Sequence, residues 1–410
     1  MRGAVLACGA NILSGFLTEQ GTGRREEVVV CGCGERMESQ GVRPKELLTI
    51  LGPVTYERSM FQCPACQATR YPGDEALDVV GTTRSPGLRR MMARAGSQST
   101  FKDGRDDLKI YAGLEVSAKD VERVAERIGQ EMDTWGEQER QDLLREASSP
   151  EPNKDIPVMY VSYDGTGVPM RPEELIGVKG KHADGMAKTR EAKLGCVFTQ
   201  TTRDEQDNPV RDPHSTTYVG AIESSSDFGH RLCQEAHRRG LKRAQKLVLL
   251  SDGATYNHAV AREHFPLATH IIDFYHASER LTLFVKENTA HSVPGAYHQQ
   301  GYALLEDGRI EELIDHMRQA LPHRGARRKA GMKQIRYYAE RVEQMRYAQF
   351  RAQGLFVGSG VIEAGCKTLI GKRLKQPGMF WSVPGANAII AARCCLYSGR
   401  FEQFWESAGS

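Results

Sequence analysis

The chain has 410 residues, too many for one ordinary hydrophobic core, and its length predicts roughly two to four domains. Hydrophobic residues make up 40% of it, a globular proportion, and no apolar run reaches the ~18 residues of a transmembrane helix. The formal net charge is only +3, so whole-molecule charge gives no argument for nucleic acid, and such binding has to rest on local basic clusters. Without a secretory hydrophobic region either, the sequence predicts a cytoplasmic protein with no membrane partner.

Residues 1–25 form a lead-in segment without clear periodicity, either a short helix or a poorly ordered arm. Residues 26–80 contain two close cysteine pairs that flank two short expected strands: Cys31/Cys33, 47–54, 56–61 and Cys63/Cys66. Four thiolates in two knuckles predict a zinc ribbon, in which a tetrahedral Zn²⁺ replaces a core that this segment is too short to build. The alternatives are buried free cysteines or a metal site that this copy has lost.

Residues 81–147 change to helical spacing, with a break at Gly113 and a capping serine at Ser117. Helix, glycine-containing turn and helix together predict a helix-turn-helix domain that binds DNA. Its basic side chains are available for phosphates: Arg84, Arg89, Arg90, Arg94, Lys119, Arg123 and Arg127. Because acids interleave with these bases, a helical hairpin with a solvated charged face is the alternative. A linker is expected at 148–153.

Residues 154–276 contain two apolar runs that each end in Asp-Gly, at Asp164 and at Asp252. We expect each aspartate at the C-terminal end of a buried strand, facing a turn. The expected elements are strands at 157–163, 192–201 and 217–222, a helix at 228–239, a strand at 246–251, a helix at 256–264 and a strand at 269–273. An antiparallel meander followed by α/β units is the order of an RNase H-like core, which places the first strand beside the fourth and brings the two acids together.

Residues 277–355 are predicted to be an all-helical insertion in this core. The segment is basic, and its strongest candidates for DNA phosphates are Arg327, Arg328 and Lys329. A solvated surface run is the alternative.

Residues 356–406 contain Glu363 on an expected helix that opens after a glycine-serine-glycine sequence and ends at Pro377. Lys367 is four residues further, so it lies on the same face, where it can reach a phosphate; Lys372 and Arg373 are further DNA candidates. A surface ion pair without a role is the alternative. Two aspartates at strand ends and one glutamate on a helix are the ligands needed to hold two divalent cations, Mg²⁺ or Mn²⁺, for phosphodiester chemistry.

Five motifs occur in one order: 164–170 (DGTGVPM), 189–193 (TREAK), 251–254 (SDGA), 273–276 (DFYH) and 358–375, which contains Glu363. From Cys31 to Trp405 the chain resembles the bacterial insertion-sequence transposases of the ISKra family. The resemblance implies a DDE-type recombinase whose metal-binding triad is Asp164, Asp252 and Glu363. Asp273 and His276 are similar to the acid-x-x-His motif of Mutator-like transposases, which implies an accessory role near the triad.

The sequence therefore predicts a multidomain α+β transposase: a zinc ribbon and a helix-turn-helix, then an RNase H-like core with a helical insertion. As a homo-oligomer on double-stranded DNA, it would bind both the terminal repeats of its element and the target DNA. It would catalyse strand cleavage and strand transfer. The alternatives are a metal-dependent nuclease of the same fold, which cuts but does not join, and an inactive DNA-binding protein descended from a transposase.

Overall fold

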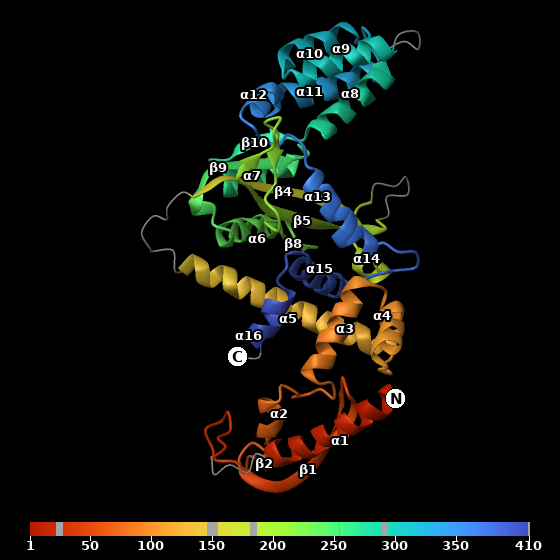
Figure 1. Cartoon of the computed structure of the whole chain (residues 1–410). Coiled ribbons are helices and arrows are strands. Elements are labelled where there is room, and N and C mark those ends of the chain that lie inside the picture. Colours follow the sequence, from red (N-terminus) through yellow and green to blue (C-terminus); the bar gives the residue numbers. More distant parts are fainter. Residues whose placement is uncertain (22–27, 146–154, 181–186, 254, 289–293, 409–410) are drawn as a thin grey trace. The chain divides into compact units, whose positions relative to one another are not determined.

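A computed structural model describes residues 1–21, 28–145, 155–180, 187–253, 255–288 and 294–408 (Figure 1). The expected linker at 148–153 lies outside the described residues. The chain divides into two compact units, Met1–Ile128 and Gly129–Ser410, each of which is described by itself. The finer domain boundaries remain predictions. Within the described ranges, no helix has the length and apolar character to cross a bilayer.

The first unit contains a small antiparallel sheet of β1 (Glu38–Thr49), β2 (Gly52–Gln62) and β3 (Thr69–Arg70). The expected strand break between 54 and 56 is wrong, because β2 runs through it and Leu47 pairs with Val54. The turn lies instead at 50–51. Gly52 takes the positive φ of 116° that the turn requires, and the Thr49 hydroxyl donates to the carbonyl of Gly52 over 2.9 Å.

The lead-in segment is a helix, α1 (Arg2–Gly21), in its described part. Ala10 and Leu17 are buried against Val54 and Tyr56 of the hairpin. Of the two readings left open by the sequence, the helix is therefore the observed one. The helix supplies the apolar surface against which one face of the hairpin is buried.

The rest of this unit is helical: α2 (Pro72–Ala76), α3 (Pro86–Gln98), α4 (Phe101–Asp107), the π-helix η1 (Leu108–Ala112) and the first part of α5 (Ala118–Arg145), whose residues from Gly129 on belong to the second unit. Ser85 and Thr100 cap α3 and α4 by accepting from the backbone N–H three residues further on. Leu88, Met92 and Val121 form the core of the helical group. Two large apolar side chains of η1, Ile110 and Tyr111, are exposed.

The second unit is built on a five-stranded mixed sheet in the order β10-β9-β4-β5-β8. The strands are β4 (Ile156–Pro169), β5 (Thr189–Gln200), β8 (Thr217–Ala221), β9 (Ala244–Ser251) and β10 (Thr269–Ile272). Strands β4, β5 and β8 pair antiparallel, whereas β9 is parallel to both β4 and β10. The expected meander with its following α/β units is observed, and β4 lies beside β9. A separate pair, β6 (Thr202–Arg203) and β7 (Pro209–Val210), extends the turn after β5.

The two faces of this sheet pack on different elements. Met159, Val161 and Tyr163 of β4 are buried against α6 (Ser225–Arg238) and α7 (Thr255–His264). On the opposite face, Tyr160 stacks on Phe198 with ring centroids 4.8 Å apart. Because side chains alternate along a strand, Asp164 lies on the same face as Tyr160. Short 3₁₀ turns, η2 (Pro172–Leu175) and η3 (Leu241–Arg243), connect the strands.

Between β10 and the C-terminal part lies a group of helices: α8 (Phe274–Asn288), α9 (Pro294–Glu306), α10 (Ile310–Gln319), α11 (Ala326–Ala339), the 3₁₀ turn η4 (Val342–Met345) and α12 (Tyr347–Ala352) (Figure 1). Their core includes Leu281, Phe284, Leu305, Leu313 and Ile335. An all-helical insertion was expected over 277–355; the helices are observed and begin at Phe274, three residues before the predicted start, and the assignment of the segment as an insertion stays a prediction.

After the insertion, three short helical segments follow one another without a break: α13 (Gly360–Gly365), the π-helix η5 (Cys366–Gly371) and α14 (Lys372–Leu374). Then come α15 (Val383–Tyr397) and α16 (Phe401–Ala408). Helix α15 packs on the edge strand β8, where Asn387 accepts from the N–H of Ile222 over 2.7 Å. The helix that was expected to carry Glu363 and to end at Pro377 corresponds to α13, η5 and α14.

Candidate active-site cleft

A cleft with a volume of about 910 Å³ opens where β4, α8 and the α13–α14 segment meet. It is lined by Asp164, Thr166, Tyr275, His276, Glu279, Gly360, Glu363, Cys366, Lys367, Gly371, Lys372 and Lys375. Three elements that are far apart in the sequence thus bring acidic, basic and aromatic side chains to one place.

The prediction that Asp164 ends its strand is wrong. Strand β4 continues to Pro169 along β5, whereas its pairing with β9 stops at Ser162. Asp164 therefore lies two residues beyond the last β4–β9 pair, on a strand that is supported on one side only. Its Oδ1 accepts from the N–H of Gly165 over 2.7 Å. Burial and the nearby negative charge of Asp252 raise the pKa of Asp164.

Asp252 follows β9 directly and begins a turn, as predicted. Gly253 has a φ of +75°, and a Cβ there would lie 2.6 Å from the hydroxyl oxygen of Tyr337, so only glycine fits. That hydroxyl donates to the carbonyl of Asp252 over 3.0 Å. Tyr337 belongs to α11, so the helical insertion holds the turn that carries the second acid.

Glu363 projects from α13, whose close approach to the sheet depends on Gly365. A Cβ at Gly365 would lie 2.9 Å from the Tyr218 ring and 3.2 Å from the Leu194 side chain. Glu363 accepts from the Ser359 hydroxyl over 3.3 Å and lies 3.9 Å from the Lys367 ammonium. The following π-helical turn places Cys366 beside Asp164, where the thiol hydrogen-bonds to the carboxylate.

Asp273 is fully buried, and its two carboxylate oxygens serve different elements. Oδ1 accepts from the backbone N–H of His276 over 2.7 Å and caps α8. Oδ2 accepts from the N–H of Ser359, immediately before α13. Because both oxygens are used within the protein, Asp273 ties the helix that carries Glu363 to the end of the sheet.

His276 lies on the first turn of α8 with its Nδ1 3.0 Å from Asp273 Oδ1. The hydrogen bond with Asp273 and the surrounding carboxylates raise the pKa of His276 to about 9. The side chain is one-third exposed and faces the cleft. It is therefore a positive charge among the acids of the cleft.

The ligand atoms of Asp273, His276 and Glu363 all lie within 4.8 Å of one another. Over the described residues, no group with this spacing contains Asp164, Asp252 and Glu363 together. The three carboxylates carry like charges and repel one another. Two cations held about 4 Å apart also need ligands that are spread more widely than the ligands of one ion. Asp164 and Glu363 share the cleft, and Asp252 acts on Asp164 through its charge.

The basic residues predicted for DNA divide into exposed and buried groups. Lys367 and Lys372 are exposed on the cleft. Arg373 is fully buried over the Trp381 ring, with 5.1 Å to the centroid, so its prediction as a DNA contact is wrong. Two residues after Arg373, Lys375 lines the cleft, and its ammonium contacts the Thr166 hydroxyl. Helical periodicity explains this, because one residue of the run has to face the core.

The prediction of Arg89 as a DNA contact is also wrong, because this side chain is buried in the first unit and bonded to the carboxylate and carbonyl of Asp78. Arg84 is paired with Asp120. The other candidates are exposed: Arg90, Arg94, Lys119, Arg123 and Arg127 in the first unit and Arg327, Arg328 and Lys329 at the start of α11. Their prediction as DNA contacts stays a prediction.

The four predicted zinc ligands come together in the first unit. Cys31 Sγ lies 3.4 Å from Cys66 Sγ, and Cys33 Sγ lies 3.6 Å from Cys63 Sγ. All four sulfurs lie within 4.8 Å of one another. Tetrahedral Zn–S bonds of about 2.3 Å require sulfur separations of about 3.8 Å. The cluster therefore fits a single Zn²⁺.

Several residues of the cleft were not found from the sequence: Thr166, Tyr275, Glu279, Cys366 and, beneath it, Tyr337. The sequence offered a usable signal for three of them, since Thr166, Tyr275 and Cys366 lie inside the motifs at 164–170, 273–276 and 358–375. Glu279 and Tyr337 lie outside these motifs and depend on contacts between segments far apart in the chain.

No model of a known protein family matches the sequence, and no curated protein matches it either. Among solved structures, a chain of the Drosophila P element transposase strand transfer complex is similar to it at a TM-score of 0.25 and 9% sequence identity, over 78% of this chain and 80% of that one. The functional proposal therefore rests on the residues of the cleft.

Proposed function

We propose that the protein is a DDE-type DNA transposase that cleaves and joins DNA strands in the cleft described above. The observation that carries this proposal is the convergence of Asp164 and Glu363 with three lysines on one open cleft, beside the turn of Asp252. Carboxylates suit hard divalent cations, and lysines beside them suit the phosphates of a DNA strand. The order and direction of the five strands support an RNase H-like core.

Asp164, Asp252 and Glu363 would hold the cations, and the donor set fits them because it consists of carboxylate oxygens, the ligands that hard divalent cations prefer. Two divalent cations, when bound, supply activation of the attacking water or 3′-hydroxyl and stabilisation of the leaving oxygen. Lys367, Lys372 and Lys375 would position the strand by contacts to its phosphates. Asp273 would fix the position of Glu363 through the N–H of Ser359.

DNA recognition would belong to the first unit. The Cys31–Cys66 cluster with Zn²⁺ would hold the hairpin, and exposed Arg90 and Arg123 would contact phosphates of the terminal repeats. The exposed run Arg327–Lys329 would add a second phosphate contact from the helical insertion. Assembly of several copies on double-stranded DNA belongs to the same proposal.

The test begins with the ends of the element, which sequencing the DNA on both sides of the gene would define. A supercoiled plasmid that carries these ends is then incubated with protein and Mg²⁺, and nicked, linear and joined products are quantified. We expect cleavage at the ends followed by joining to a target. Cleavage without any joined product would favour a nuclease, and neither reaction would refute the proposal.

Asp164→Asn, Asp252→Asn and Glu363→Gln should each abolish cleavage while they leave affinity for the ends nearly intact, because each removes a charge at constant shape. Glu287→Gln, an exposed change on α8, is the matched control and should cleave as the wild type does. A variant that retains more than about a tenth of wild-type cleavage would remove its residue from the triad, since losing a metal ligand costs several kcal/mol in the transition state.

A further inference from the structure

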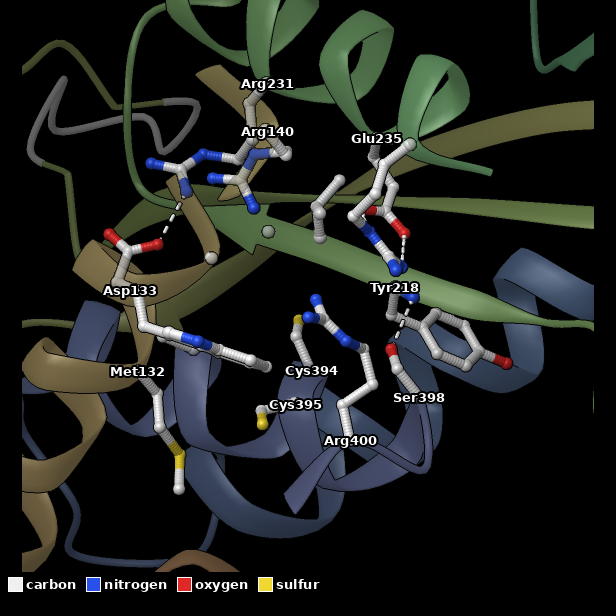
Figure 2. Close-up of a pocket in the computed structure, with 16 residues that line it drawn as sticks. Met132, Asp133, Arg140, Tyr218, Arg231, Glu235, Cys394, Cys395, Ser398 and Arg400 are labelled. Atoms are coloured by element: carbon white, nitrogen blue, oxygen red, sulfur yellow. Dashed lines mark hydrogen bonds and ion pairs between the residues drawn. The ribbon is translucent and has the colours of Figure 1, made fainter. Parts of the chain in front are cut away.

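A second cavity lies away from the cleft, in the same unit, between the C-terminal half of α5, strand β8, helix α6 and the α15–α16 turn (Figure 2). Its volume is about 40 Å³. Four arginines line it, Arg140, Arg231, Arg238 and Arg400, together with only two acids, Asp133 and Glu235. Figure 2 shows Arg140 and Arg400 reaching toward the cavity from opposite sides, beside Cys394. Such a concentration of positive charge in a small buried space needs compensation.

Arg140 is the arginine whose positive charge lacks compensation by a carboxylate. The residue is only 6% exposed, and its Nε has no hydrogen-bond partner. Over the described residues, its guanidinium makes neither an ion pair nor a hydrogen bond. Burial and the charge of Arg231 lower the pKa of Arg140. An arginine nevertheless keeps its proton in proteins, so a full positive charge remains in the cavity wall.

Both acids that line the cavity are already used by another arginine, and Glu137, one turn before Arg140 on α5, accepts from the Gln141 amide over 3.1 Å. Arg231 bonds to Asp133 over 2.6 Å and to Glu223 over 2.9 Å. Arg238 binds Glu235 through two nitrogens, over 2.8 and 2.5 Å.

The remaining arginine, Arg400, is paired with Glu139 and stacks over the Trp135 ring, 4.2 Å from its centroid. Each of the other three guanidinium groups therefore has its own carboxylate. Arg140 is left over, and Glu235 is also occupied by the hydroxyl of Thr217, 2.6 Å away.

The size of the cavity and the protonated state of its thiols narrow the choice of counterion for Arg140. One water needs about 10–15 Å³ of such space, so 40 Å³ holds a small ion with one or two waters and excludes a nucleotide phosphate with its sugar. Burial raises the pKa of Cys395 to about 12 and that of Cys394 as well, so both thiols remain protonated and do not repel an anion. Thiols and the Ser398 hydroxyl on this wall are donors.

We propose that this cavity binds one small monovalent inorganic anion, chloride being the probe, between Arg140, Arg400 and the Cys394 thiol. The anion would compensate the charge of Arg140 and thereby fasten the C-terminal half of α5 to β8, α6 and the α15–α16 turn. It is a structural anion site, and it does not depend on the proposed transposase activity.

The direct test replaces chloride by bromide. Crystals of the full chain grown in bromide are measured at the bromine absorption edge, where bromide alone scatters anomalously. An anomalous peak in the cavity, within about 3.5 Å of an Arg140 nitrogen, is the expected result. A cavity that holds only water would overturn the proposal, as would an Arg140 guanidinium bonded to a protein carboxylate.

A solution measurement tests the same site without crystals. The melting temperature of the full chain is followed against chloride concentration at constant ionic strength, with gluconate, which is too large for the cavity, as the replacement. We expect a rise that follows the logarithm of the chloride concentration and reaches about 3–11 °C, because a ligand at ten to a hundred times its dissociation constant contributes about 1.4–2.7 kcal/mol, at about 2–4 °C per kcal/mol. A flat curve for the wild type would overturn the proposal.

Arg140→Met keeps the length of the side chain and removes the charge, so its melting temperature should not respond to chloride. Arg324→Met removes the same charge from an exposed position and should respond as the wild type does. Arg140→Lys keeps a charge in the cavity wall and should retain a weaker response. An Arg140→Met protein that responds fully would show that the chloride effect arises elsewhere and would refute the site.

Discussion

Replacing Asp273 by asparagine should destabilise the second unit strongly, although it only exchanges one carboxylate for an amide of the same shape. The carboxylate is fully buried and accepts three hydrogen bonds, two from His276 and one from the N–H of Ser359. An asparagine oxygen can keep the pair from His276, but its amide then turns a donor toward the Ser359 N–H. One charge-assisted bond is lost, and a buried N–H is left without an acceptor.

Hydrogen bonds to charged groups contribute about 1.5–3 kcal/mol, and an unpaired buried N–H costs about 1–3 kcal/mol. Allowing for relaxation, we expect Asp273→Asn to lower the free energy of unfolding by about 2–4 kcal/mol. At about 2–4 °C per kcal/mol, the melting temperature should fall by about 4–16 °C.

Urea unfolding followed by circular dichroism measures the first quantity, and a melting curve measures the second. Asp307→Asn, an exposed change in the turn between α9 and α10, is the matched control and should stay within about 0.5 kcal/mol of the wild type. If Asp273→Asn also stayed within that range, the buried carboxylate would not hold α13 to the sheet.

Three further predictions concern separate contacts. Cys63→Ser should lose the one Zn²⁺ per chain that elemental analysis is expected to find, and with it the binding of DNA ends, while the second unit stays folded; purified wild type without zinc would contradict this. His276→Ala should slow single-turnover cleavage roughly ten- to a hundredfold and, because it removes the side-chain bond to buried Asp273, lower the free energy of unfolding by about 1.5–3 kcal/mol; an unchanged rate of the folded protein would give His276 a purely structural role. Tyr337→Phe removes the donor to the Asp252 carbonyl and should cost about 1 kcal/mol in urea unfolding; no loss would mean that the insertion does not support this turn.

The strands of the second unit could be predicted because their apolar residues and their turns are local signals. Val158 to Tyr163 alternate in a β-branched and aromatic run, and the Asp252-Gly253 sequence marks a turn with positive φ. The end of β4 was misplaced for a non-local reason. Glycines at 165 and 167 suggest a turn, yet here they make room for the side chains of Glu191 and Thr189 on β5.

The cleft could be predicted only in part, because charge in a sequence does not reveal which partner a side chain finds. Arg89 and Arg373 resemble the exposed bases around them, but one meets Asp78 and the other packs over Trp381. Asp273 belongs to a motif that suggested an accessory position, whereas its bond to Ser359 spans 86 residues and could not be seen. The hydrogen bond from the Tyr337 hydroxyl to the carbonyl of Asp252 likewise joins distant segments and could not be seen in the sequence.

The central claim is that Asp164, Asp252 and Glu363 together hold divalent cations, and iron-mediated cleavage of the protein backbone tests it most directly. Fe²⁺ can take the place of Mg²⁺ at oxygen ligands, and with ascorbate and peroxide it cuts the chain next to where it is bound. We expect cuts near 164, 252 and 363 that excess Mg²⁺ suppresses and that Glu363→Gln weakens at all three positions. Cuts confined to other segments, or a pattern that neither Mg²⁺ nor Glu363→Gln changes, would contradict the account.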